Sequence, residues 1–136
     1  MKGLLADINI AWQMRSLVDR FYSSDEWLDI WNSLGIACHF FEEFGLDPRS
    51  QDDLVWQTCQ DSELVLITAN RNQDGPASLE TTIRLRLRPD SLPVITVSRA
   101  KSLGLNAGYT AQVGIKLLEY LFDIDFHRGT GRLYVP

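Results

Sequence analysis

Several features are scarce or missing in this sequence, and each absence narrows what the protein does. Only two cysteines, Cys38 and Cys59, occur in 136 residues. They show no Cys-x-x-Cys spacing and no histidine at ligand spacing, so we expect buried reduced thiols. No stretch approaches the roughly 20 uninterrupted apolar residues of a membrane span. The N-terminal residues MKGLLADINI are too short and too acidic for a signal peptide. We therefore expect a cytoplasmic protein that does not bind membranes.

The sequence also lacks common catalytic and phosphate-binding motifs. There are two histidines and no Gly-x-Ser-x-Gly, which leaves no serine-hydrolase signature. Gly104, Gly108 and Gly114 have the wrong spacing for a glycine-rich phosphate loop. The net charge of −5 argues against bulk electrostatic capture of nucleic acid. It does not exclude a site that is locally acidic because it holds a metal ion.

Short apolar runs alternate with amphipathic segments along the chain. This alternation predicts an α/β fold with a mostly parallel central sheet in three α/β/α layers. The length fits one domain, residues 1–136. The expected strands are Lys2–Ile8, Ile36–Phe41, Leu64–Thr68, Val94–Val97 and Leu133–Val135. The expected helices are Ala11–Tyr22, a helix between Ser24 and Gly35, Gln51–Gln60, a helix beginning at Ser78–Glu80, and Ala107–Phe122.

Helical spacing also predicts which side chains enter the core. We expect buried stripes on the helix before Gly35 and on the last helix. Their members are Trp27, Ile30, Trp31, Leu34, Ala111, Ile115, Leu118 and Phe122.

The functional hypothesis depends mainly on the stretch Asp61–Asp74. Its apolar run, Leu64–Thr68, suits a strand buried on both faces. The polar residues Asn70–Asp74 follow at the strand's carboxyl end, where open α/β sheets bind their ligands. An ordinary Asn/Asp turn is the alternative, because Gly75 and Pro76 come next.

Carboxylates from other segments should meet this loop at the same edge of the sheet. Asp7 ends the first strand, and Asn9 would share its face there. Asp52 and Asp53 begin a helix, where the helix dipole alone could also explain them. Gathered carboxylates repel one another unless a hard cation such as Mg²⁺ or Mn²⁺ lies between them. Such ions support the hydrolysis of phosphodiesters.

These residues resemble the PIN-like domains, in particular small bacterial members related to the toxins of toxin–antitoxin pairs. The resemblance covers about residues 1–97. It rests on Asp7-Ile8-Asn9, on Glu43-Phe44-Gly45-Leu46 followed by Asp52, and on Thr68-Ala69-Asn70-Arg71-Asn72. It implies a magnesium- or manganese-dependent ribonuclease, with RNA as substrate, an antitoxin or another protein as partner, and possible homodimers.

The resemblance also implies a set of site residues. Asp7, Asp52 and Asp74 would be the catalytic and metal-binding acids. Asn9, Asn70, Arg71 and Asn72 would contact the substrate. The family pattern has aspartates where this chain has Asn70 and Asn72, and an amide supplies no charge. Asp74 could replace a missing carboxylate, and Asp53 or Glu43 could add one. The site nevertheless has fewer carboxylates than the family pattern.

Two other functions remain open. One is a non-catalytic module that keeps the fold and binds a protein partner through a surface aromatic patch. The other is metal-free RNA binding through arginines, because guanidinium groups suit phosphate. The arginines concerned are Arg84, Arg86, Arg88, Arg128 and Arg132.

Overall fold

The computed structural model describes residues 1–69 and 75–136, and a parallel sheet lies at its centre. In these residues five strands pair in the order β2-β1-β3-β4-β5, and every pairing is parallel. The expected α/β class with a parallel sheet is confirmed. The strands are β1 (Gly3–Ala6), β2 (Ala37–His39), β3 (Leu64–Thr68), β4 (Val94–Val97) and β5 (Arg132–Val135).

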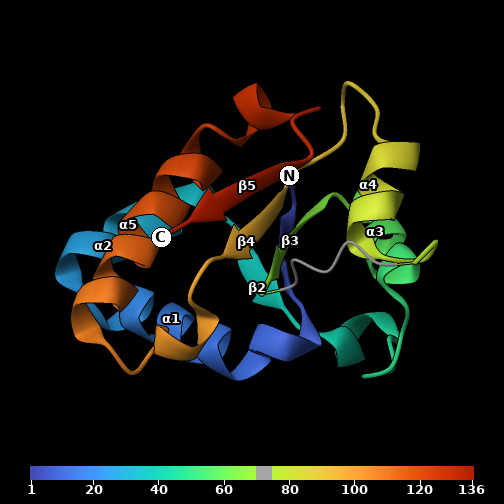
Figure 1. Ribbon diagram of the computed structural model, residues 1–136. Helices are drawn as coiled ribbons and strands as arrows, with labels where there is room; N and C mark the ends of the chain where they lie inside the picture. Colours follow the sequence, from blue (N-terminus) through green and yellow to red (C-terminus); the bar gives the residue numbers. More distant parts are fainter. Residues whose placement is uncertain (70–74) are drawn as a thin grey trace.

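Helices cover both faces of this sheet and complete the three layers (Figure 1). α1, α2 and α5 pack on one face, and α3 and α4 pack on the other. Within the described residues, no helix is both long enough and apolar enough to cross a membrane. The helices are α1 (Ala11–Ser23), α2 (Asp25–Leu34), α3 (Asp52–Asp61), α4 (Leu79–Arg86) and α5 (Ala107–Phe122).

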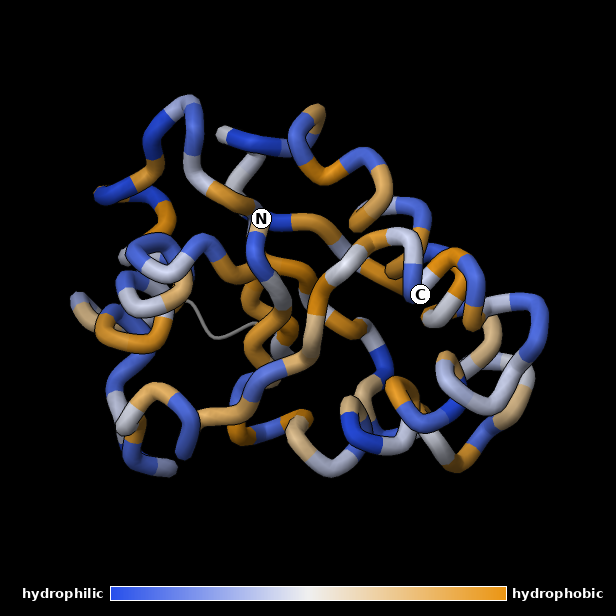
Figure 2. The backbone as a smooth tube through the Cα atoms, turned by 180° about the vertical axis from the view of Figure 1, so that it is seen from behind, coloured by the Kyte–Doolittle hydropathy of each residue, from blue (hydrophilic) through white to orange (hydrophobic). Residues whose placement is uncertain are grey.

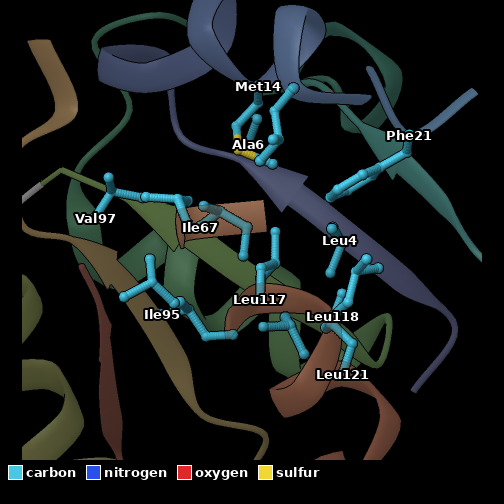
Figure 3. Packing of buried hydrophobic residues seen from close by; sticks show 14 of the residues in the cluster. Leu4, Ala6, Met14, Phe21, Ile67, Ile95, Val97, Leu117, Leu118 and Leu121 are labelled. Carbon is cyan, nitrogen blue, oxygen red and sulfur yellow. The ribbon is translucent and has the colours of Figure 1, made fainter. Parts of the chain in front are cut away.

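The central strands are mostly apolar because both of their faces are buried, and their polar residues, Thr68 and Thr96, are buried as well. Leu4 belongs to the core under α1, α2 and α5, whereas its neighbour Leu5 points to the core under α3 and α4. Val65 and Leu66 of β3 alternate in the same way. Hydrophobic segments gather in the middle of the molecule (Figure 2), and β1, β3 and β4 meet α1 and α5 in the larger core (Figure 3). This two-sided burial is typical of parallel sheets.

The helices agree more closely with their predicted bounds than the strands do. α5 is helical from Ala107 to Phe122, as expected. The helix predicted to begin at Ser78–Glu80 extends to Arg86, and the Ser78 hydroxyl accepts a hydrogen bond from the backbone N–H of Thr81 at 3.2 Å. β1 ends at Ala6 rather than Ile8, and β2 covers only Ala37–His39.

The predicted core faces of α2 and α5 were partly wrong. Trp27 and Trp31 are buried as expected, but Ile30 is 40% exposed. Ile115 is 48% and Phe122 is 68% exposed. α5 is apolar on more than one side, so its periodicity permits several stripes, and packing against the sheet selects one of them. The residues it buries are Tyr109, Thr110, Val113, Gly114, Leu117, Leu118 and Leu121.

Gly114 allows α5 to approach α2 closely. A Cβ added at this position would lie 2.7 Å from Cη2 and 2.8 Å from Cζ3 of Trp27, a ring that is only 7% exposed. We expect Gly114→Ala to destabilise the protein by about 1 to 3 kcal/mol through overpacking, partly offset by the better helix propensity of alanine. Denaturant unfolding measures the change.

Gly108 of the same helix provides the matched control. A Cβ at Gly108 would meet only Oδ1 of Asn106, at 3.5 Å. We expect Gly108→Ala to leave the free energy of unfolding unchanged or to raise it. Equal effects of the two substitutions on the free energy of unfolding would show that α2 and α5 can pack together without a glycine at position 114.

Both cysteines are free thiols, as the sequence predicts. Cys59 is buried, and Cys38 is half-buried. Burial, followed by the charge of Glu43, raises the pKa of the Cys38 thiol to about 12. Burial is also the main cause that raises the pKa of Cys59. Both side chains therefore stay protonated and unreactive at neutral pH.

Candidate functional site

The chain changes direction across the sheet at the carboxyl ends of β1 and β3. β2 lies on one side of β1, whereas β3, β4 and β5 follow on the other side. In open parallel sheets this switch point forms the usual ligand crevice. Asp7 follows β1 here, and Thr68 is the last residue of β3. The position that the sequence predicts for the site is therefore the one where this topology binds ligands.

Asp7 is held in place by two donors. Its Oδ1 accepts a hydrogen bond from the backbone N–H of Ile8 at 2.7 Å and so caps the short 3₁₀ helix η1 (Ile8–Ile10). Its Oδ2 accepts a hydrogen bond from the Thr68 hydroxyl, also at 2.7 Å. The side chain is only 6% exposed. A buried carboxylate with both oxygens fixed has a well-defined orientation at the end of the sheet.

Asn9 also contacts Thr68, but it does so from a different local structure than the one that we predicted. The sequence suggested that Asp7 and Asn9 would share one face of a strand, yet Asn9 lies in η1 after the strand has ended. Its side-chain N–H₂ donates to the Thr68 hydroxyl at 3.5 Å, and its Oδ1 accepts from the backbone N–H of Ala69 at 3.2 Å. The turn of η1 brings Asn9 back over β3, so the two residues still meet at Thr68.

The pKa of Asp7 is raised above its usual value of 3.8. Burial is the largest cause; the hydrogen bonds from Thr68 and Ile8 oppose it, and the negative charge of Asp52 adds to it. Asp7 and Asp52 lie on different elements, and the charge of Asp52 is the smallest of these four contributions to the pKa of Asp7. A cation between two such carboxylates would offset both the free-energy cost of burying a charged group and the repulsion between the two charges.

Asp52 begins α3 and reaches across to α4. Its Oδ2 accepts a hydrogen bond from the backbone N–H of Leu79, the first residue of α4, at 3.2 Å. Asp53 points elsewhere: its Oδ1 accepts from the N–H of Leu54 at 2.8 Å, and its Oδ2 lies 3.7 Å from a guanidinium nitrogen of Arg86. Of these two acids, Asp52 is the one whose charge contributes to the raised pKa of Asp7.

Glu43 also has partners of its own. One carboxylate oxygen lies 2.9 Å from Nδ1 of His39, and the other accepts the backbone N–H of Phe40 at 2.6 Å. The hydrogen bond with His39 is the main reason that the pKa of Glu43 is lowered. These contacts hold Glu43 at the end of β2 rather than beside Asp7.

Carboxylate, amide and hydroxyl oxygens are the ligand types that Mg²⁺ and Mn²⁺ prefer. Asp7, Asp52, Asn9 and Thr68 carry such oxygens, and each of these side chains already makes at least one hydrogen bond within the protein. Among residues 1–69 and 75–136 no group of three or more His, Cys, Asp and Glu residues could hold a metal ion. The predicted site residues Asn70, Arg71, Asn72 and Asp74 lie outside the described residues.

Two basic residues that the sequence analysis overlooked lie next to the cluster. Arg99 and Lys101 follow β4 at the same edge of the sheet, and the Arg99 guanidinium stacks 4.3 Å from the centroid of the Tyr109 ring. The signal was available, because both residues come directly after a predicted strand. They line a cavity of about 530 Å³ together with Asn9, Gln13, Ala69, Ser98, Ala100 and Ser102.

The predicted arginine clusters lie away from this site. Arg86, Arg88 and Arg128 line a different cavity, of about 460 Å³, beside the residues that precede β3 and β4 at the amino edge of the sheet. The side chain of Arg132 in β5 is only 8% exposed and pairs with Glu80 of α4 at 3.1 Å. These arginines therefore do not add to the positive charge around Asp7.

The fold and the site together define an α/β domain with an all-parallel sheet and a polar cluster at its switch point. No protein-family model matches the chain, and no curated protein or solved structure matches it significantly. Membership of the PIN-like family therefore stays a prediction from the sequence motifs.

Proposed function

We propose that the protein is a PIN-like, metal-dependent phosphodiesterase that acts on RNA through an acidic site with fewer carboxylates than the family pattern. The observation that supports this proposal best is the buried carboxylate of Asp7, whose pKa is raised by burial and by the charge of Asp52. Clusters of this kind, with perturbed titration in a ligand crevice, are typical of functional sites. The oxygen donors around Asp7 fit Mg²⁺ or Mn²⁺, with Asp7 and Asp52 as the anionic ligands.

Each described side chain has a part in this proposal. The hydroxyl of Thr68 and the N–H of Ile8 orient Asp7 toward the site. The bound cation would supply Lewis-acid polarisation of a phosphoryl oxygen and lower the pKa of a water molecule. Arg99 and Lys101, in the adjoining cavity, would bind neighbouring phosphate groups of the substrate.

The residues outside the described ranges complete the proposal from the sequence. Asn70 and Asn72 would be neutral ligands or would contact the substrate, as would Arg71. Asp74 would supply a third carboxylate. With fewer acids than the family pattern, the cation should bind weakly, so Mn²⁺ is the better probe for activity.

The direct test is cleavage of an end-labelled single-stranded RNA in the presence of Mn²⁺. We expect slow cleavage by the wild type and a loss of at least about 100-fold in Asp7→Asn, the scale seen when an acid–base or electrostatic group is removed. Arg99→Ala should weaken substrate binding, whereas Arg88→Ala, at the opposite edge and 80% exposed, should not. Equal cleavage by wild type and Asp7→Asn would place the activity outside this site.

A further inference from the structure

The faces of α2 and α5 that point away from the sheet form an apolar groove with a volume of about 420 Å³. The two helices lie next to each other on one side of the molecule (Figure 1). Trp27 and Leu118 are nearly buried, while Ile30, Ile115 and Phe122 remain 40%, 48% and 68% exposed. Large apolar side chains in one concave patch mark an interaction surface more often than scattered ones do.

The spacing of these side chains suits a helical partner. Ile115, Leu118 and Phe122 follow one another at helical intervals along α5, and they span about 10 Å at a rise of 1.5 Å per residue. Trp27 and Ile30 provide the opposite wall from α2. A groove between two helices is the usual receptor for an amphipathic helix that inserts apolar anchors at i, i+3 or i+4, and i+7.

The charge around the groove defines the partner further. The polar residues that line it, Glu26, Glu119 and Asp123, are all acidic. Two cations lie nearby: Lys116 pairs with Glu119 at 3.4 Å, and Arg20 lies 5.8 Å from the Trp27 ring. The lining itself nevertheless carries only negative side chains. A second copy of this chain would bring two acidic rims together, which like-charge repulsion disfavours.

We propose that this groove binds an amphipathic helix of another protein, with apolar anchors flanked by lysine and arginine. The apolar face would cover Trp27, Ile30, Ile115 and Phe122, and the basic flanks would meet Glu26, Glu119 and Asp123. The groove lies on the helical layer formed by α2 and α5, whereas Asp52 lies in the layer on the other face of the sheet. The proposal is therefore independent of phosphodiester cleavage.

A designed peptide provides the probe. We would use a 20-residue amphipathic peptide with leucines at i, i+3, i+4 and i+7 and lysines beside them, and a second peptide with the same leucines and glutamates in place of the lysines. Fluorescence anisotropy against the full chain measures both affinities. We expect the basic peptide to bind with a dissociation constant of roughly micromolar size and the acidic peptide at least about tenfold more weakly.

Matched variants test whether the peptide binds in the groove or to exposed apolar side chains in general. Phe122→Ala should weaken binding of the basic peptide by at least about tenfold, as expected when a large aromatic side chain is removed from an interface. Phe126→Ala, which is 88% exposed and outside the groove, should not. Glu119→Lys combined with Asp123→Lys should reverse the preference toward the acidic peptide. Both changes fall at the end of α5, where the helix dipole favours cations.

Four results would overturn the proposal. One is equal binding of the two peptides, because the rim would then not select charge. Another is binding that Phe122→Ala leaves intact, and a third is no binding of either peptide at millimolar concentration. Sedimentation should show a monomer, and a dimer that Phe122→Ala dissociates would assign the groove to a second copy of the chain. Circular dichroism of each variant confirms that it is folded.

Discussion

The Asp7→Asn variant is expected to be more stable than the wild type at pH 7 and to lose all stabilisation by Mn²⁺. Burial raises the pKa of Asp7 above 3.8, so the folded protein resists ionisation of this carboxyl. Asparagine has almost the same shape and carries no charge. It can still accept from the N–H of Ile8, and its amide can still contact the Thr68 hydroxyl.

The pH dependence follows from the direction of this shift. A carboxyl with a raised folded-state pKa stabilises the fold fully at pH values below its unfolded pKa, and this contribution is lost as the pH rises through the folded pKa. The wild type should therefore match Asp7→Asn in stability near pH 3.8 and below. The variant should gain its advantage progressively as the pH increases above that value.

Mn²⁺ should favour the wild type over Asp7→Asn, whereas a rise in pH should favour the variant. A ligand that binds only the folded state at 100 times its dissociation constant adds about 2.7 kcal/mol to the free energy of unfolding. We expect a gain of this kind for the wild type in Mn²⁺ and none for Asp7→Asn. Asp53→Asn removes one charge beside Asp52 without touching the cluster, so it should keep the gain. Equal gains in all three proteins would mean that Mn²⁺ binds elsewhere.

Trp31→Ala is expected to cost about 3 to 5 kcal/mol of unfolding free energy, the range for truncating a large buried aromatic side chain. Trp31 is 1% exposed, and its ring centroid lies 5.1 Å from that of Phe21. Small domains have a total stability of about 5 to 15 kcal/mol, so the variant would be close to unfolding. Urea denaturation followed by circular dichroism measures the loss.

Trp12 is the control for this substitution because it is 62% exposed. We expect Trp12→Ala to change the stability by no more than about 0.5 kcal/mol. Comparable losses from the two substitutions would contradict the assignment of Trp31 to the core.

The sequence predicted elements best where one local signal determined them. The run Leu64–Thr68 could be assigned because four consecutive apolar residues before Thr68 are typical of a strand buried on both faces. The end of α2 at Gly35 follows from its left-handed backbone, with φ of 63°. The predicted first strand ended two residues too late, at Ile8, because Asp7 caps the 3₁₀ helix η1 by accepting the backbone N–H of Ile8 and the strand ends at Ala6.

The place of Asp7 and Asp52 in the fold could be predicted from the sequence, whereas their side-chain contacts could not. Parallel topology alone brings Asp7 and Asp52 to one edge of the sheet. The choice of Asp52 over Asp53 depends on rotation about the axis of α3, which a first-turn Asp-Asp pair does not determine. The exposed face of α5 could not be predicted either. Ile115 and Phe122 have the spacing of a buried stripe, but α5 is apolar on more than one side, and its packing on the sheet and on α2 decides which side is buried.

The central claim is that Asp7 and Asp52 together hold a divalent cation, and calorimetric titration of the purified protein with Mn²⁺ tests it without any assumption about the substrate. Asp52→Asn is the comparison, because it removes the charge that interacts with Asp7. The account predicts saturable binding by the wild type that is lost in Asp52→Asn. No binding by the wild type up to millimolar Mn²⁺, or equal binding by both proteins, would contradict it.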